Sequence, residues 1–148
     1  METKEFKKAF NAIAIQNGFK SFFGAWIKES ADCFLALILR KSNFSKLYYL
    51  RIKVNLKSAF GQVFENNKEW IQHDIAHIML GTDKQFDKVF DLENEMTESE
   101  RREQMQKMFK TNINRLADKA STRKGLAELH KNNEAFLLGP VKHELGVD

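Results

Sequence analysis

The sequence contains a single cysteine, Cys33, among its 148 residues, so an intrachain disulfide is excluded. A chain of this length buries roughly 70% of the surface that its unfolded form exposes, and it needs neither a disulfide nor a metal to hold its fold. Cys33 lies in an apolar run, where a lone thiol is typical of a small core residue. We therefore expect a reducing compartment and predict a cytoplasmic protein.

Long hydrophobic stretches are also missing from the chain. The longest apolar run is far shorter than the ~20 residues that a membrane helix needs, so we expect no membrane partner. The opening residues, Met-Glu-Thr-Lys, hold no apolar segment of the kind that a secretory signal carries.

The motifs of the commoner enzymes are absent. The chain has no P-loop, no G-x-G-x-x-G, no C-x-x-C and no G-x-S-x-G. Their absence argues against nucleotide-dependent chemistry and against the common hydrolase mechanisms. We expect no cofactor, and the sequence favours a non-catalytic protein while leaving enzymatic activity open.

The composition is that of an ordinary folded domain. Hydrophobic residues make up 43% of the chain and charged residues 30%, which does not suggest disorder. We predict one domain over residues 1–148, with 141–148 as a frayed tail after Pro140. The 13 phenylalanines predict a phenylalanine-rich core, and the net charge of +4 is mild for a nucleic-acid binder.

Two strands joined by a short turn are the clearest pattern in the sequence. The continuous apolar run from Cys33 to Leu39 is typical of a strand covered on both faces. Residues 46–57 alternate, which predicts one buried face and one wet face. The buried face would carry Tyr48, Leu50, Ile52, Val54 and Leu56, and the wet face Tyr49, Arg51, Lys53, Asn55 and Lys57.

Helices are predicted on both sides of this pair in the sequence. The first would be capped by Thr3 and end near Asn17, with an apolar face of Phe6, Ala9, Phe10, Ile13 and Ala14. Thr97 and Glu100 form a capping box for the strongest helix, whose apolar face is Met105, Met108, Phe109, Ile113, Leu116, Ala117 and Ala120. Ser121 would cap a further helix that carries Leu126 and Leu129.

The remaining segments are less regular. We expect a hairpin or one bent strand over residues 19–29 and a short edge strand over 89–92, whereas 68–80 fits either a helix or a strand. The fold class that results is α+β: an antiparallel sheet of about four to five strands with an N-terminal helix and C-terminal helices packed on it. Leu37 and Ile52 should face Met108 and Leu116 in its core.

The order of these elements carries a family resemblance. A first helix ends in N-G-F-K at residues 17–20, two strands follow, and then comes H-x-x-x-H-I-x-L-G-x-D-x-x-F from His73 to Phe86. Over roughly residues 3–130 the chain resembles an uncharacterised bacterial domain-of-unknown-function family of the 4304-type. The resemblance implies an α+β fold with helices on an antiparallel sheet, and it implies no activity and no catalytic residues.

His73 and His77 are the candidate metal ligands. On a helix they would share one face, one turn apart, as two zinc ligands do in zinc proteases. Asp74 stands where those proteases have a glutamate, and a third ligand would have to come from Glu93, Glu95 or Glu98. Because no third ligand is fixed by the spacing, we expect two partly exposed histidines and no metal.

The candidate ligand-binding residues are the outward side chains Tyr49, Arg51, Lys53 and Lys57. Residues 40–57 hold six basic residues and no acid, and basic side chains interleaved with an aromatic one are how some sheets bind single-stranded nucleic acid. A solvated sheet face whose lysines prevent aggregation has the same pattern.

Three functions follow, in order of preference. The first is a non-catalytic protein-interaction domain with an unidentified protein partner. The alternative is binding of nucleic acid or another polyanion through Tyr49–Lys57, and the third is an enzyme with a dispersed site near His73 and His77. The sequence leaves the oligomeric state and the strand order open.

Overall fold

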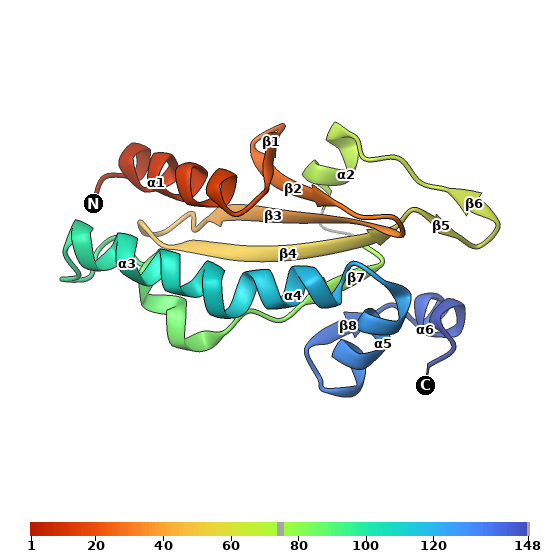
Figure 1. The fold of residues 1–148 in the computed structure, drawn as a ribbon. Coiled ribbons are helices and arrows are strands. Elements are labelled where there is room, and N and C mark those ends of the chain that lie inside the picture. Colours follow the sequence, from red (N-terminus) through yellow and green to blue (C-terminus); the bar gives the residue numbers. More distant parts are fainter. Residues whose placement is uncertain (74–75, 148) are drawn as a thin grey trace.

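Six antiparallel strands form one sheet in the computed structural model, which describes residues 1–73 and 76–147 (Figure 1). The predicted α+β fold is confirmed, and the sheet exceeds the expected four to five strands. Its order is β1-β2-β3-β4-β7-β8. The strands are β1 (Lys20–Phe22), β2 (Ala25–Glu29), β3 (Cys33–Lys41), β4 (Tyr48–Leu56), β7 (Ile78–Leu80) and β8 (Ala135–Leu137).

The predicted strand pair forms the centre of the sheet. β3 and β4 pair along their whole length, from Cys33 opposite Leu56 to Lys41 opposite Tyr48. The alternation predicted for β4 holds on one side of the sheet, its inner face, where Tyr48, Ile52, Val54 and Leu56 are buried and Leu50 is partly buried.

Two helical segments cover the inner face. They are α1 (Thr3–Gln16) and the continuous run of α3 (Glu98–Met108), the π-helical turn η2 (Phe109–Ile113) and α4 (Asn114–Lys119). Phe10 of α1 and Phe109 of η2 meet with ring centroids 5.4 Å apart. All the apolar residues predicted for these helices are buried, as are Leu37, Ile52, Met108 and Leu116, so the predicted core is confirmed.

The opposite, outer face of the sheet is partly covered by α2 (Lys68–Gln72). Ile71 of α2 packs against Ala25, Ala36 and Ile38 in a second, smaller apolar cluster. This cluster explains why β3 reads as a continuous apolar run, because the strand is buried from both sides. Residues 68–80, which the sequence leaves ambiguous, contain a short helix and then strand β7.

Three local predictions are corrected. Residues 89–92 form no edge strand, because Val89 and Phe90 end the 3₁₀ helix η1 (Lys84–Phe90), which Asp83 caps. Thr3 does not cap α1; Glu2 occupies that position. Helix α5 (Arg123–Lys131) is capped by Thr122, whose hydroxyl accepts a hydrogen bond from the Gly125 N–H (3.0 Å), and not by Ser121.

Other local predictions hold. The capping box is present, since Thr97 Oγ1 accepts from the Glu100 N–H (3.1 Å) and Glu100 Oε2 accepts from the Thr97 N–H (3.0 Å). Residues 20–29 form the β1–β2 hairpin. A second hairpin, β5 (Ser58–Ala59) with β6 (Gln62–Val63), lies apart from the main sheet. Among the described residues, no helix is both long and apolar enough to cross a membrane.

The predicted frayed tail is wrong for residues 141–145. Helix α6 (Gly139–Leu145) follows β8, and Val141 is 1% exposed within the main core. Proline stops a helix that precedes it, but its fixed φ also suits the first turn of a helix that follows. Pro140 lies in that first turn, so it begins α6 instead of ending the fold.

The docking of α6 can be tested with one substitution at two sites. We expect Val141→Asp to lower the free energy of unfolding by at least about 2 kcal/mol, because it places a carboxylate among apolar side chains. Val63→Asp is the matched control; Val63 is 81% exposed, so its change should stay within about 0.5 kcal/mol. Urea denaturation followed by circular dichroism measures both, and a frayed tail would leave the two variants equally stable.

Candidate functional site

The four residues of the predicted basic face do not project together. Tyr49 and Arg51 are exposed, as the alternation predicts. Lys53 is only 1% exposed, because α2 lies over this part of the outer face. Lys57 Nζ lies 3.2 Å from Glu29 Oε1, so its charge is paired within the sheet. The expected solvated face is therefore wrong at Lys53, and at Lys57 the charge is partly neutralised.

Lys53 is a structural residue beneath α2. Its ammonium group donates hydrogen bonds to the backbone carbonyls of Trp70 and His73, at the C-terminal end of that helix. The last carbonyls of a helix lack intrahelical partners and carry partial negative charge, so a cation satisfies both needs. Lys53 Nζ also lies 5.1 Å from the centroid of the Trp70 ring.

Basic residues that remain accessible gather at the β3–β4 turn. Arg40 donates to the carbonyls of Ile71 (3.5 Å) and Gln72 (3.3 Å), so it too holds the end of α2. An open hollow beside it is lined by Arg40, Lys41, Ser42, Asn43, Phe44, Tyr49, Arg51 and Gln72. Of the four residues of the predicted face, this hollow includes Tyr49 and Arg51 but neither Lys53 nor Lys57.

His73 and His77 lie on different elements. His73 follows α2, and His77 immediately precedes β7. Asp74 lies outside the described residues. No group of three or more His, Cys, Asp or Glu side chains within residues 1–73 and 76–147 is arranged to hold a metal ion.

His77 links the end of β4 to β7. Its Nδ1 accepts a hydrogen bond from the Leu56 N–H (3.0 Å), and its backbone N–H donates to Asn55 Oδ1 (2.9 Å). The ring is 4.6 Å from that of Phe64, measured between centroids. Burial lowers the pKa of His77, and the nearby carboxylate of Glu144 opposes that shift in part. An acceptor at Nδ1 requires the neutral ring, so burial and hydrogen bonding favour the same state.

Cys33 is buried, as predicted. Burial, together with the neighbouring Asp32, raises the pKa of its thiol to about 11. Since the thiolate is the nucleophilic form, Cys33 has the character of a core residue and not of a reactive one.

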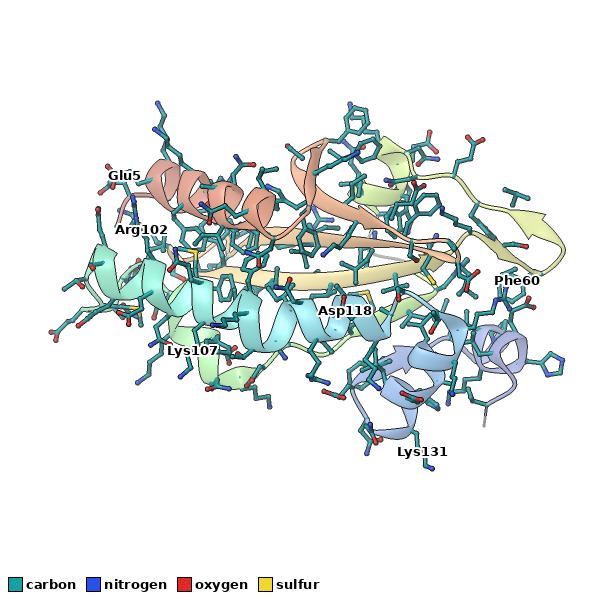
Figure 2. The ribbon with its side chains drawn as sticks, in the orientation of Figure 1. Glu5, Phe60, Arg102, Lys107, Asp118 and Lys131 are labelled. Carbon is teal, nitrogen blue, oxygen red and sulfur yellow. The ribbon has the colours of Figure 1, made fainter. Side chains whose placement is uncertain are left out.

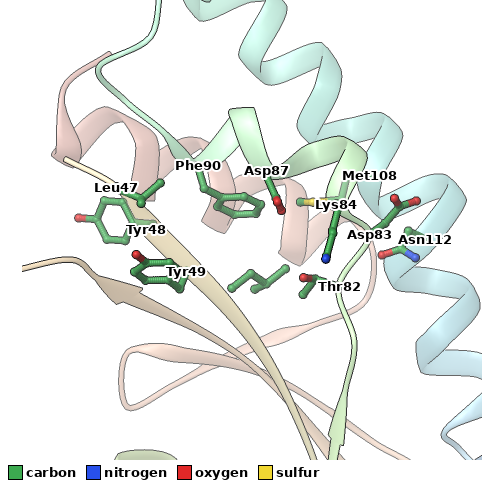
Figure 3. Close-up of a pocket in the computed structure, with 11 residues that line it drawn as sticks. Leu47, Tyr48, Tyr49, Thr82, Asp83, Lys84, Asp87, Phe90, Met108 and Asn112 are labelled. Atoms are coloured by element: carbon green, nitrogen blue, oxygen red, sulfur yellow. The ribbon is translucent and has the colours of Figure 1, made fainter. Parts of the chain in front are cut away.

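A pocket that sequence reasoning missed lies beside β4 (Figure 3). β7 pairs only with Ile52–Val54, and the chain then leaves the sheet to form η1. It returns at Asp91, opposite Leu47, and the Leu92 N–H donates to the Lys46 carbonyl (2.9 Å). Between these two contacts a cavity of about 370 Å³ remains, which we call the β4-edge pocket.

The β4-edge pocket combines an apolar wall with polar groups. Its lining is Leu47, Tyr48, Tyr49, Leu50, Thr82, Asp83, Lys84, Asp87, Phe90, Met108 and Asn112. One signal in the sequence marks Asn112. It falls four residues after Met108 and four before Leu116, so it is a polar residue on the apolar face of the strongest helix.

Buried Arg101 fixes one wall of this pocket. Its guanidinium donates to the carbonyls of Lys88 (3.2 Å), Val89 (2.6 Å) and Asp91 (3.1 Å), and to Asn94 Oδ1 (2.9 Å). Burial lowers its pKa, and the Asp91 carboxylate partly opposes that effect. These bonds tie the end of η1 to α3, so the segment that closes the pocket is held to the helix behind it.

Four exposed apolar side chains lie on the β5–β6 hairpin and on or next to β8, and we call this region the β8 end: Phe60, Val63, Phe136 and Leu138. Phe60 is in the turn of the β5–β6 hairpin (Figure 2), and its ring centroid is 5.7 Å from that of His77. The His77 carbonyl accepts from the Leu138 N–H (3.4 Å). His77 therefore lies between the hairpin and the strand that carry these side chains.

Lys53 and Arg51 are neighbours on one face of β4, and the burial of Lys53 predicts that charge reversal lowers stability much more at Lys53 than at Arg51. We expect Lys53→Glu to lower the free energy of unfolding by about 3 kcal/mol or more, because a carboxylate would face the carbonyls of Trp70 and His73. Arg51→Glu, at an exposed site, should change it by no more than about 0.5 kcal/mol. Chemical denaturation of both variants tests this, and equal stabilities would mean that α2 does not cover Lys53.

The lowered pKa of His77 predicts a loss of stability in acid. A group whose folded pKa lies below its unfolded value stabilises the fold fully above the unfolded value, and the contribution is lost as the pH falls below it. Between about pH 7.5 and pH 5.5 the wild type should therefore lose more stability than His77→Gln, which cannot titrate. His143→Gln, at an exposed position of α6, is the control and should retain the wild-type slope. Parallel slopes for the wild type and His77→Gln would contradict the prediction.

Comparison with known proteins found no relative of this chain. No family model matches the chain, no curated protein matches it, and no solved structure matches it. The resemblance to the uncharacterised bacterial family therefore stays a prediction, and the function has to be argued from the residues themselves.

Proposed function

We propose that this chain is a non-catalytic protein-interaction domain that receives a protein partner at the β8 end. The observation that carries the proposal is the exposure of large apolar side chains there: Phe136 is 65% exposed and Leu138 49%. Apolar surface in water is unfavourable, and exposed apolar patches commonly mark protein contacts.

The backbone that carries these side chains is held in place. Phe136 lies opposite Met79 in the β7–β8 ladder, and the hydrogen bond from Leu138 to His77 extends the pairing. A backbone fixed before binding does not have to be ordered on association, which favours affinity. Aromatic residues are also enriched among the residues that dominate binding energy.

The two other functions have less support. Polyanion binding relied on four outward residues, of which Lys53 is buried beneath α2 and Lys57 is paired with Glu29. A site near His73 and His77 relied on their convergence, and the His77 Nδ1 is occupied by the Leu56 N–H. The cytoplasmic location belongs to the same proposal, supported by the single buried thiol of Cys33.

The proposal is tested by comparing apolar-to-serine changes at two exposed sites. The tagged wild type is used to capture partners from the source cell, and each captured protein is purified and titrated against the variants by calorimetry. We expect the double change Phe136→Ser and Leu138→Ser to weaken binding by at least about tenfold, because it removes the central apolar contacts.

The matched control is Phe44→Ser, which alters the most exposed aromatic residue of the β3–β4 turn, away from β8. It should leave affinity unchanged. If Phe44→Ser weakens binding and the β8 double variant does not, the partner binds elsewhere and the proposed surface is wrong. Unchanged unfolding transitions in both variants would exclude a loss of fold as the cause.

A further inference from the structure

One wall of the β4-edge pocket is an interrupted β-ladder. Successive residues of a strand direct their backbone groups to opposite sides. The Lys57 N–H donates to Asp32 on the β3 side (2.8 Å), whereas the Leu56 N–H and the Lys46 carbonyl bond on the β7 side. By this alternation, the N–H and carbonyl of Leu50 point toward β7, into the pocket.

Leu50 has no partner on that side. The ladder with β7 ends at Ile52 opposite Leu80, and one more step would place Thr82 opposite Leu50. The chain turns into η1 there, and no hydrogen bond joins Leu50 to Thr82 or to any other described residue on this side. The pocket wall therefore offers one backbone donor and one backbone acceptor with the spacing of a β-ladder.

The opposite wall offers a second donor and acceptor. Asn112 is only 8% exposed and lines the pocket, and its amide forms no hydrogen bond to another residue in the described part of the chain. Neither Oδ1 nor Nδ2 of Asn112 is a buried atom left without a partner, so the amide is open to the cavity and available to a molecule that enters it. Asn112 also belongs to the π-helical turn η2, and such turns are frequent at functional sites.

The charges around the pocket favour a neutral occupant. Asp83 already accepts hydrogen bonds from the backbone N–H (3.1 Å) and the side-chain amide (2.6 Å) of Gln85. Lys84 and Asp87, both exposed on η1, contribute opposite charges at the rim. The remaining lining is largely apolar, with Phe90 and Met108 among it.

From these groups we propose that the β4-edge pocket binds a small neutral molecule with a carboxamide-type edge on an apolar body. The edge pairs with both the Leu50 backbone and the Asn112 amide, and the body lies against Phe90 and Met108. A cavity of about 370 Å³ has the size of a small-molecule site. The inference does not depend on the partner proposed for the β8 end.

Three matched probes test it: benzamide, benzoate and benzylamine, which share a ring and differ in the charge of the polar group. Two-dimensional ¹H–¹⁵N NMR of the wild type follows the Leu50 backbone N–H and the Asn112 side-chain amide. We expect benzamide to shift both signals saturably in the millimolar range, as its small size implies, and to bind at least about tenfold more tightly than the two charged probes.

Asn112→Leu separates the polar contact from the apolar one. It should weaken benzamide binding by at least about tenfold without weakening the fold, because it replaces an unpartnered amide by an apolar side chain of similar size. Asn114→Leu is the control on the same helical run; Asn114 donates to Asn17 Oδ1 (2.8 Å), away from the pocket, and its change should leave benzamide binding intact.

The wild-type spectra alone can overturn the proposal. It fails if benzamide produces no saturable shift of the Leu50 N–H, or if benzoate or benzylamine binds as tightly as benzamide. It also fails if Asn112→Leu, folded by its NMR spectrum, binds benzamide as the wild type does.

Discussion

The full-length pairing of β3 with β4 is the constraint on which the rest of the structure depends. Both strands have nine residues, and their register fixes which β4 side chains face the inner helices. β7 is only three residues long, so it satisfies only part of the other edge of β4. The mismatch in length leaves part of the β7-side edge of β4 without a strand partner, and residues 82–90 pass over this edge to enclose the β4-edge pocket.

Two buried cations hold the segments that are not fixed by the sheet. Lys53 binds carbonyls at the end of α2, and Arg101 binds carbonyls at the end of η1. In both places a cation replaces the missing partners of carbonyls at the end of a short helix. Hydrogen bonds to a charged donor are stronger than neutral ones, and a buried cation that loses its acceptors is strongly destabilising. These two residues thus explain how short helices keep fixed positions on a small domain.

The sequence predicts well the features that depend on local spacing. It predicts poorly which surfaces are buried by segments distant in the sequence. The inner face of β4, the capping box at Thr97 and the apolar faces of α1 and α3 depend on local spacing, and all are found as predicted. Whether Lys53 is wet depends on α2, which is placed by contacts to Arg40 and Ile38 far from it in sequence. The alternation of a strand states which side a residue faces and not what lies on that side.

Arg101 of α3 and Asn112 of η2 are polar residues on the inward face of this helical run, and the sequence does not show which of them finds partners in the fold. Asn112 interrupts an apolar stripe and is identifiable in the sequence as an exception, whereas Arg101 lies in the charged segment before Met105 and carries no such signal. The fold gives Arg101 four acceptors and gives Asn112 none among the described residues. Arg101 is a structural support, although its Nε is buried without a hydrogen-bond partner in the described part of the chain. The amide of Asn112 instead opens to the cavity beside the unpaired edge of β4, where a molecule from outside the chain can complete its hydrogen bonds.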